Sequence, residues 1–248
     1  MTSTKKCSVI IPVFNEKEGI EEFIQSIYKQ TRHPDEIIII DGWSTDGTYE
    51  YLKTQETKWH LKVYKHLSNI AEARNVAIAK ASHDIILCTD AGCKVDSHRC
   101  ESLMHIYETT DEVVVGGKSE LLGNNSFQKK AKHRFVSPDP NFHFVSSRNI
   151  SFYKNVRKEV GGYPEYLTKR GEDTYFNYKI EQAEYKIFFC PQAIVQRNMG
   201  KTYYEFYKMY RNYTQGDAEV YMIHKVLQSG TCKQGILSTL IFLMLLWS

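Results

Sequence analysis

The chain has 248 residues, of which 42% are hydrophobic and 25% are charged, and its formal net charge is +3 at pH 7. This hydrophobic content can fill a packed core and argues against a disordered chain, while so mild a basic excess argues against a nucleic-acid surface. Six cysteines without a CxxC pair are typical of reduced thiols that pack as small apolar side chains.

Four short runs rich in β-branched residues alternate with amphipathic stretches in the first part of the chain. The runs at 7–13, 36–41, 61–65 and 84–89 are too brief for helices and predict strands. Pro12 and the polar NEKEG segment behind it fit a buried strand and not a signal peptide. The alternation predicts an α/β fold with a mostly parallel central sheet and helices on both faces, whose ligands bind beyond the carboxyl ends of the strands.

The pattern is less regular after residue 111. The sequence VVVGGKSEL predicts another strand, and segment 137–155 indicates turns and an irregular, aromatic-rich strand. A helix is expected from Lys201 to His224, where tyrosines mixed with basic residues suit a membrane interface. The final apolar run, GILSTLIFLMLLWS, is too short to span a bilayer by itself and is either an interfacial anchor or a shortened spanning helix.

Five segments in a fixed order carry a family resemblance: SVIIPVFNE, IIIIDGWSTDGT, AEARNVAIAKA, ILCTDAGC and GGYPEYLTKRGED. They resemble the ordered blocks of inverting family 2 glycosyltransferases. The resemblance implies an A-type glycosyltransferase fold and transfer of a sugar from a nucleoside-diphosphate sugar, with UDP-sugars the most frequent donors. It also implies a glycan or lipid-linked hydroxyl acceptor at the cytoplasmic face of a membrane. The QxxRW block of processive members is absent, which favours transfer of one or a few sugars.

The resemblance also implies a division of the chain. Residues 1–200 form the catalytic domain, in which 1–111 bind the nucleotide-sugar and 112–200 bind the acceptor. Residues 201–248 form a helical, membrane-associated segment.

The resemblance implies a nucleotide-sugar site made largely from side chains that follow the first two strands. Those side chains are Pro12, Asn15, Glu16, Asp41 and Asp46. Asp41 would accept a hydrogen bond from the base, because a carboxylate is only an acceptor and a uracil offers a donor. Asp46 either contacts the ligand or caps the next helix. Arg74 would hold the diphosphate in a bidentate fork, unless it is an ordinary surface arginine.

Asp90 follows the fourth run, where the family places its Asp-x-Asp metal motif. Here Gly92 stands at the third position, so the motif reads DAG. Mg²⁺ or Mn²⁺ needs only one or two protein carboxylates when substrate phosphates and waters complete its coordination. Asp90 is therefore the expected metal ligand, and the ion would neutralise charge on the departing nucleoside diphosphate.

The acidic pair Glu172 and Asp173 opens a helical stretch and matches the family's catalytic pair. An inverting transfer needs a general base for the acceptor hydroxyl, and the resemblance assigns that role to Asp173, with Glu172 orienting the acceptor or the loop. Helix N-termini also favour acids without any catalysis. Ser147 and Arg148 in the SSR block would bind diphosphate or acceptor, unless they form a turn with a solvated arginine. Arg211 and Asp217 are further candidates for acceptor or phosphate contacts.

Two other functions share this fold. A sugar nucleotidyltransferase usually has a Gly-rich basic loop after the first strand, whereas VFNEKEG is acidic. A catalytically idle nucleotide-binding scaffold of a membrane glycan complex is favoured by DAG in place of Asp-x-Asp, and the intact acidic pair argues against it.

Overall fold

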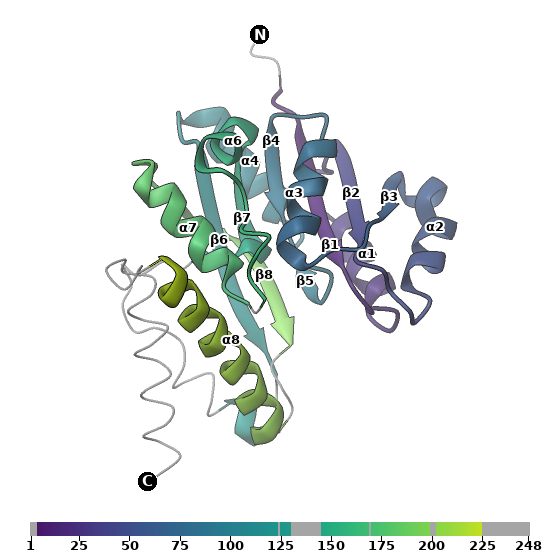
Figure 1. Cartoon of the computed structure of the whole chain (residues 1–248). Helices are drawn as coiled ribbons and strands as arrows, with labels where there is room; N and C mark the ends of the chain where they lie inside the picture. Colours follow the sequence, from purple (N-terminus) through teal and green to yellow (C-terminus); the bar gives the residue numbers. More distant parts are fainter. Residues whose placement is uncertain (1–3, 124, 130–144, 169, 199–201, 225–248) are drawn as a thin grey trace.

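The computed structural model describes residues 4–123, 125–129, 145–168, 170–198 and 202–224 (Figure 1). Its centre is an eight-stranded mixed sheet with the strand order β3-β2-β1-β4-β7-β6-β8-β5. The strands are β1 (Cys7–Val13), β2 (Glu36–Asp41), β3 (Leu61–Lys65), β4 (Ile85–Cys88), β5 (Cys93–Val95), β6 (Val114–Leu122), β7 (Ile150–Tyr153) and β8 (Phe188–Asn198). The helices are α1 (Ile20–Tyr28), α2 (Thr48–Trp59), α3 (Ile70–Lys80), α4 (Arg99–Thr109), η1 (Ser147–Asn149), α6 (Lys154–Val160), α7 (Glu172–Gln182) and α8 (Tyr203–His224).

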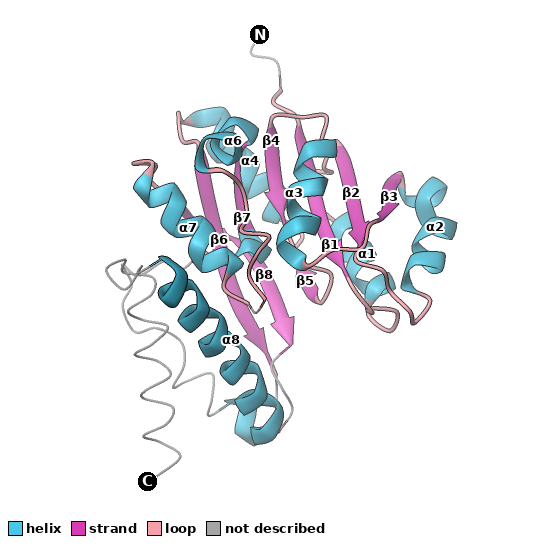
Figure 2. Ribbon diagram, viewed as in Figure 1, coloured by secondary structure: helices cyan, strands magenta, loops and turns pink. Residues whose placement is uncertain are grey.

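The first four predicted strands are present and pair in parallel, in the order β3-β2-β1-β4. Side chains alternate between the two faces of β1, because successive residues of a strand point in opposite directions. Val9 and Ile11 pack in the same core as α1 and α4, whereas Ile10 packs in the core that contains α3, α6 and α7. Helices therefore cover both faces of the sheet, as the sequence predicts (Figure 2).

The second part of the sheet departs from parallel pairing at two strands. β7 lies antiparallel between β4 and β6, and β5 lies antiparallel beside β8. β6 and β8 pair in parallel, with a register shift between Gly117 and Lys118. The sheet is thus mostly parallel, and it runs without interruption through both predicted halves. The boundary at residue 111 stays a prediction.

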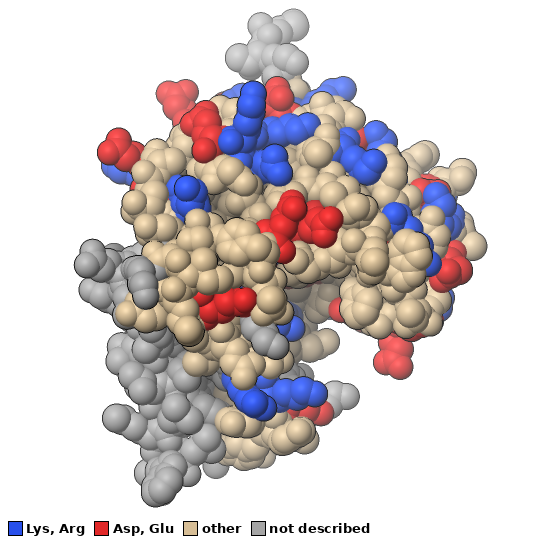
Figure 3. Space-filling view, viewed as in Figure 1, with Lys and Arg blue, Asp and Glu red and all other residues tan. Residues whose placement is uncertain are grey.

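The predicted C-terminal helix is present as α8 and packs through its buried residues Phe206 and Val220. None of the helices in the described part of the chain is long and apolar enough to cross a membrane. The apolar run 235–248 lies outside the described residues. On the face drawn in Figure 3, basic side chains gather toward the end that carries α6, and acidic side chains form separate smaller groups.

The cysteines within the described residues are free and buried, as expected from their spacing. They are Cys7, Cys88, Cys93, Cys100 and Cys190.

Candidate active site

The loops that follow β1 and β2, residues 14–19 and 42–47, are bound to each other at the carboxyl edge of the sheet. We call them the strand-end loops. The Asn15 amide donates to Ser44 Oγ at 2.9 Å, and the Thr45 amide donates to Asn15 Oδ1 at 2.9 Å. Asn15 adopts a left-handed φ of 53°, which asparagine tolerates better than most residues. Pro12 lies buried within β1 and pairs with Ile40, below these loops.

Asp41 is the last residue of β2 and is fully buried. Its Oδ1 accepts hydrogen bonds from the amides of Trp43 at 3.1 Å and Ser44 at 2.9 Å. Its Oδ2 is buried and has no hydrogen-bond partner among the described residues. A buried acceptor is costly when it is unpaired, so this oxygen is suited to a ligand donor. Beside it, the side chains of Phe14 and Trp43 are 60% and 51% exposed.

Asp46 binds a backbone amide at the start of α2, as the capping alternative requires, although the N-cap residue itself is Gly47. Its Oδ1 accepts from the Thr48 amide at 3.0 Å and from the Thr48 hydroxyl at 2.6 Å, at the first residue of α2. Its Oδ2 accepts from the Lys17 amide at 3.0 Å, so it also ties the two strand-end loops together. These hydrogen bonds outweigh the effect of desolvation and lower the pKa of Asp46. Contact with a ligand stays a prediction for this residue.

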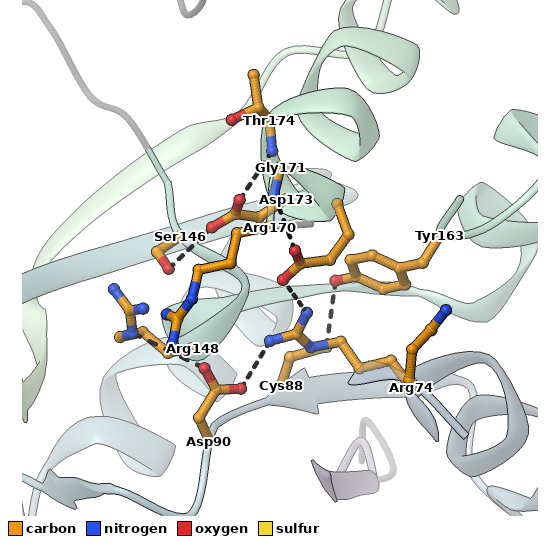
Figure 4. Close-up of polar contacts among 12 residues, drawn as sticks. Arg74, Cys88, Asp90, Ser146, Arg148, Tyr163, Arg170, Gly171, Asp173 and Thr174 are labelled. Carbon is orange, nitrogen blue, oxygen red and sulfur yellow. Dashed lines mark hydrogen bonds and ion pairs between the residues drawn. The ribbon is translucent and has the colours of Figure 1, made fainter. Parts of the chain in front are cut away.

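Arg74 of α3 joins two acids that are far apart in the sequence. Its Nη2 lies 2.7 Å from Asp90 Oδ1, and its Nη1 lies 2.7 Å from Glu172 Oε1 (Figure 4). Its side chain is 1% exposed, so it is not a surface arginine. Its guanidinium also lies over the ring of Tyr163, 5.3 Å from the centroid. With both Nη atoms on carboxylates, Arg74 fixes the distance between the two acids.

Arg148 approaches Asp90 from η1, opposite Arg74. Its Nε lies 3.8 Å from Asp90 Oδ2, and its side chain is only 15% exposed, so the alternative of a solvated turn arginine is wrong. Ser147 is buried beside the Tyr163 hydroxyl and is not available at the surface. Asn149 anchors η1, because its side chain donates to the carbonyls of Lys118 at 2.8 Å and Ala193 at 2.9 Å.

The acidic pair opens α7, as predicted. Glu172 is buried, and its Oε2 accepts from the Gly171 amide at 3.1 Å. Asp173 Oδ2 accepts from the Ser146 hydroxyl at 3.3 Å, and Figure 4 shows Asp173 directed toward the same region as Asp90 and Arg148. We call Arg74, Asp90, Arg148, Glu172 and Asp173 the acid–arginine cluster. The structure thus brings together the two acids on which the sequence interpretation depends.

Comparison with protein-family models identifies the family of the chain. Residues 8–167 match the model of "Glycosyl transferase family 2", which is more than half of the chain. The chain belongs to glycosyltransferase family 2. It is a glycosyltransferase, and the match argues against the nucleotidyltransferase alternative.

Curated relatives of this glycosyltransferase come from archaea and bacteria. It is 24% identical to the glycosyltransferase AglE of Haloferax volcanii, over 91% of this chain and 78% of that protein. It is 25% identical to the O-antigen chain rhamnosyltransferase RfbN of Salmonella typhimurium, over 83% of this chain and 70% of that protein.

Solved structures show the same fold. The crystal structure of S. aureus TarS residues 1–349 in complex with UDP-GlcNAc has a TM-score of 0.63 at 20% identity, covering 87% of this chain and 66% of that one. The mannosyltransferase PcManGT of Pyrobaculum calidifontis, in complex with GDP-Man and Mn²⁺, also has a TM-score of 0.63, at 21% identity, covering 88% and 65%. The glycosyltransferase therefore spans about two thirds of each neighbouring chain. These neighbours confirm the predicted A-type fold.

Two aspartates of the acid–arginine cluster have pKa shifts in opposite directions. Burial alone would raise the pKa of Asp90, but the charges of Arg74 and Arg148 outweigh it and hold that pKa below its usual value. The pKa of Asp173 is raised, first by burial and then by the charge of Glu172, although both arginines oppose the shift. One carboxylate is thus kept ionised, while the other is made a stronger proton acceptor.

A fourth acid, Asp217 of α8, lies close to the acidic pair, at Thr174 of α7. Its Oδ1 accepts from the Thr174 hydroxyl at 3.1 Å. Burial, followed by the charges of Asp173 and Glu172, raises the pKa of Asp217 to about 6. The adjacent Gly216 allows this approach, since a Cβ there would lie 1.6 Å from the Arg170 carbonyl oxygen.

Sequence reasoning gave Asp217 only a minor place and missed Tyr163, Ser146 and Arg170. The glycine before Asp217 was a usable signal, because a glycine inside a helix often marks close packing. Arg170 was missed because its effect on the pKa of Asp90 depends on tertiary folding. Arg211 is exposed on α8.

Asp90 fits a divalent cation through one of its two oxygens. Oδ1 is bound to Arg74 at 2.7 Å, whereas among the described residues Oδ2 has only the longer contact with Arg148 at 3.8 Å. Among the described residues, no three His, Cys, Asp or Glu side chains are grouped as metal ligands. A hard ion that is held mainly by the diphosphate and by water needs few protein oxygens, so Asp90 Oδ2 suits Mg²⁺ or Mn²⁺.

Proposed function

We propose that this glycosyltransferase moves a sugar from a nucleoside-diphosphate sugar, a UDP-sugar in the first instance, to an acceptor hydroxyl with inversion at the anomeric carbon. The acceptor is a glycan or a lipid-linked sugar, and a divalent cation assists. One observation carries the proposal: Arg74 holds Asp90 and Glu172 at 2.7 Å each, which keeps Asp173 beside the aspartate expected to face the diphosphate.

Asp173 has the properties of the general base. The residue is half-buried, its carboxylate is oriented by Ser146, and its pKa is raised. A base whose pKa lies closer to neutrality accepts the hydroxyl proton more readily as the acceptor oxygen attacks. A single displacement needs no covalent sugar–enzyme intermediate, so no serine or cysteine nucleophile is required.

The opposite side of the acid–arginine cluster suits the leaving nucleoside diphosphate. Arg148 is nearly buried, with its guanidinium close to Asp90, and Arg170 adds positive charge that lowers the pKa of Asp90. Arginines bind phosphate oxygens through charge-assisted hydrogen bonds, which strengthen where water is excluded. When bound at Asp90 Oδ2, Mg²⁺ or Mn²⁺ would supply Lewis-acid neutralisation of the same developing charge. We assign Arg74 a positioning role, because its Nη atoms are already occupied.

The strand-end loops support binding of the nucleoside. Asp41 Oδ2 is a buried acceptor without a partner among the described residues, and a uracil N3–H is a donor of the matching kind. The exposed ring of Trp43 lies next to it at a left-handed φ of 77°, a conformation that bulky residues rarely adopt outside functional loops. Asn15 and Asp46 fix the shape of these loops from within.

The proposal includes a location at the cytoplasmic face of a membrane. The start of α8 exposes Tyr203 by 65% and Tyr204 by 73%, with Lys208 and Arg211 exposed further along the helix. Tyrosines with basic neighbours suit a lipid headgroup region. Cosedimentation with anionic vesicles should be weakened by the double substitution Tyr203→Ser and Tyr204→Ser. Unchanged cosedimentation would remove the membrane from the proposal.

The decisive test separates the base from donor binding. A thermal-shift panel of nucleotide sugars with Mn²⁺ identifies the donor, since a ligand that binds the folded state raises its stability. With that donor labelled, Asp173→Asn should lower turnover by a factor of about 10² to 10⁴, the usual contribution of a general base, while the donor-induced thermal shift stays.

Glu181→Gln is the matched control. Glu181 lies on the same helix, near its other end, and is exposed. This substitution removes the same charge and should leave turnover at the wild-type level. Wild-type turnover in Asp173→Asn would contradict the proposal, and so would loss of donor binding in that variant.

A further inference from the structure

Gly92 is not required by the conformation of the backbone. It lies in the short turn between Asp90 and β5, and its φ is outside the left-handed region in which glycine is favoured. Any Cβ at this position would instead meet Glu16, whose Oε1 lies 3.3 Å from it. That separation is tight, so the glycine leaves space for the carboxylate of another residue.

Glu16 is held firmly by its main chain. Its amide donates to Thr48 Oγ1 at 3.0 Å, and its carbonyl accepts from the amides of Gly19 at 3.0 Å and Ile20 at 2.9 Å. By contrast, no described residue donates a hydrogen bond to its carboxylate, which is half-buried. The backbone hydrogen bonds therefore fix the position of Glu16, while its carboxylate accepts no hydrogen bond from the described residues.

The surroundings of this carboxylate are acidic. Burial raises the pKa of Glu16, and the charges of Asp46 and Asp90 raise it further. Asp46 cannot readily serve as a ligand, since its Oδ2 accepts a hydrogen bond from the Lys17 amide and its Oδ1 accepts one from the Thr48 amide at the start of α2. Among the described residues near the turn that contains Gly92, Glu16 and Asp90 Oδ2 therefore remain as carboxylate oxygens that could coordinate a cation.

We propose that Glu16 supplies the second carboxylate of the divalent-cation site, in place of the acid that position 92 lacks. The side of the turn on which an aspartate at 92 would carry its carboxylate is the side that Glu16 occupies. The DAG sequence then reflects a relocated ligand and not a lost one. This inference rests on the proposed function, and it moves Glu16 from the ribose pocket to the cation.

The test measures cation binding without any turnover. The full chain is titrated with Mn²⁺ in the presence of UDP, and free Mn²⁺ is followed by its electron paramagnetic resonance signal. Glu16→Gln should weaken Mn²⁺ binding about tenfold or more. Substituting even a residue that only hydrogen-bonds to a metal ligand commonly lowers metal affinity by about that factor. UDP binding without Mn²⁺ should not change.

A relocation variant makes the result specific. Glu16→Ala also removes the carboxylate and leaves room for a Cβ at position 92, so adding Gly92→Asp to Glu16→Ala should recover most of the lost Mn²⁺ affinity by returning a carboxylate to position 92. Glu18→Gln is the matched control, since Glu18 is an exposed acid of the same loop, and it should bind Mn²⁺ as the wild type does.

The outcomes separate this inference from the proposed function. Wild-type Mn²⁺ affinity in Glu16→Gln, with weakened binding in Asp90→Asn, would overturn the role of Glu16 alone. Wild-type affinity in both variants would overturn the role of Glu16 and also the cation in the proposed function. Failure of Gly92→Asp to restore binding in a double variant that still binds UDP would also overturn the relocation.

Discussion

The two sides of the site are held together by different kinds of interaction. The strand-end loops depend on side chains that bind backbone amides, such as Asp46 with Lys17 and Asn15 with Thr45. The acid–arginine cluster depends on ion pairs between side chains 98 and 16 positions apart, in which Arg74 binds both acids. The strand-end loops are therefore stabilised by several separate hydrogen bonds, whereas the acid–arginine cluster depends mainly on the buried guanidinium of Arg74.

This difference follows from what each side is expected to bind. A nucleoside presents donors and acceptors of low charge, which loops of fixed shape can match. A diphosphate and a proton transfer require charges that are fixed before the substrate arrives, because reorganising them during the reaction is costly. A substitution in the cluster should therefore affect folding as well as activity.

The largest expected effect is that of Arg74→Met. This substitution leaves Asp90 and Glu172 without their shared cation, and breaking a buried ion pair from one side costs about 3–5 kcal/mol. Urea denaturation should show that loss in the free energy of unfolding.

The control uses a partly exposed ion pair at the surface. Arg32 binds Glu108 at 2.9 Å with exposed side-chain fractions of 21% and 30%, so Arg32→Met should cost about 1 kcal/mol or less. Equal losses in the two variants would mean that the cluster is no more important to the fold than a surface ion pair.

A smaller effect, on binding and not on folding, is expected for Asp41→Asn. The variant can keep the acceptor that serves Trp43 and Ser44 while turning Oδ2 into an N–H donor. A buried donor facing the base donor should weaken nucleotide binding by about 1–3 kcal/mol, as measured by calorimetry with the nucleotide identified in the thermal-shift panel.

Asp46→Asn sharpens this test on the same loops. Both Asp46 oxygens serve the protein, so this variant should lose about 1 kcal/mol of stability and change nucleotide affinity less than Asp41→Asn does. The reverse order of affinities would assign the ligand contact to Asp46.

Positions that depend on local sequence could be predicted, whereas contacts that depend on the tertiary fold could not. Strand ends such as Asp41 and Asp90 are visible in the sequence, because a β-branched run stops there and a polar residue follows. The opening of α7 at the acidic pair is visible for a similar local reason. Predicting these positions requires only the local periodicity of a strand or a helix, and the structure places them as expected.

Contacts that depend on topology were not visible. Nothing near Arg74 in the sequence indicates Glu172, since their contact depends on a sheet in which β7 lies antiparallel between β4 and β6. The alanines around Arg74 gave a partial signal, because they bring α3 close to the sheet and bury the arginine, and a buried arginine requires acid partners. The identity of those acids still required the folded chain.

The remaining expected effect depends on pH and concerns Asp217, which lies beside Asp173 and Glu172 on the cluster side. Its pKa of about 6 lies above the ordinary value of 3.8. Between these values the folded chain keeps a proton that the unfolded chain has released, so stability falls as the pH rises through this window. Above about pH 6 the ionised Asp217 repels Asp173 and Glu172.

Asp217→Asn removes that repulsion and keeps an acceptor for Thr174. The variant should therefore be more stable than the wild type by about 1–2 kcal/mol at about pH 8, with the difference shrinking toward about pH 4, in urea denaturation at each pH. Asp111→Asn, at an exposed aspartate away from the site, should show no such pH-dependent difference. Lower stability of Asp217→Asn at both pH values would mean that Asp217 stabilises α8 through its hydrogen bond more than its charge opposes the fold.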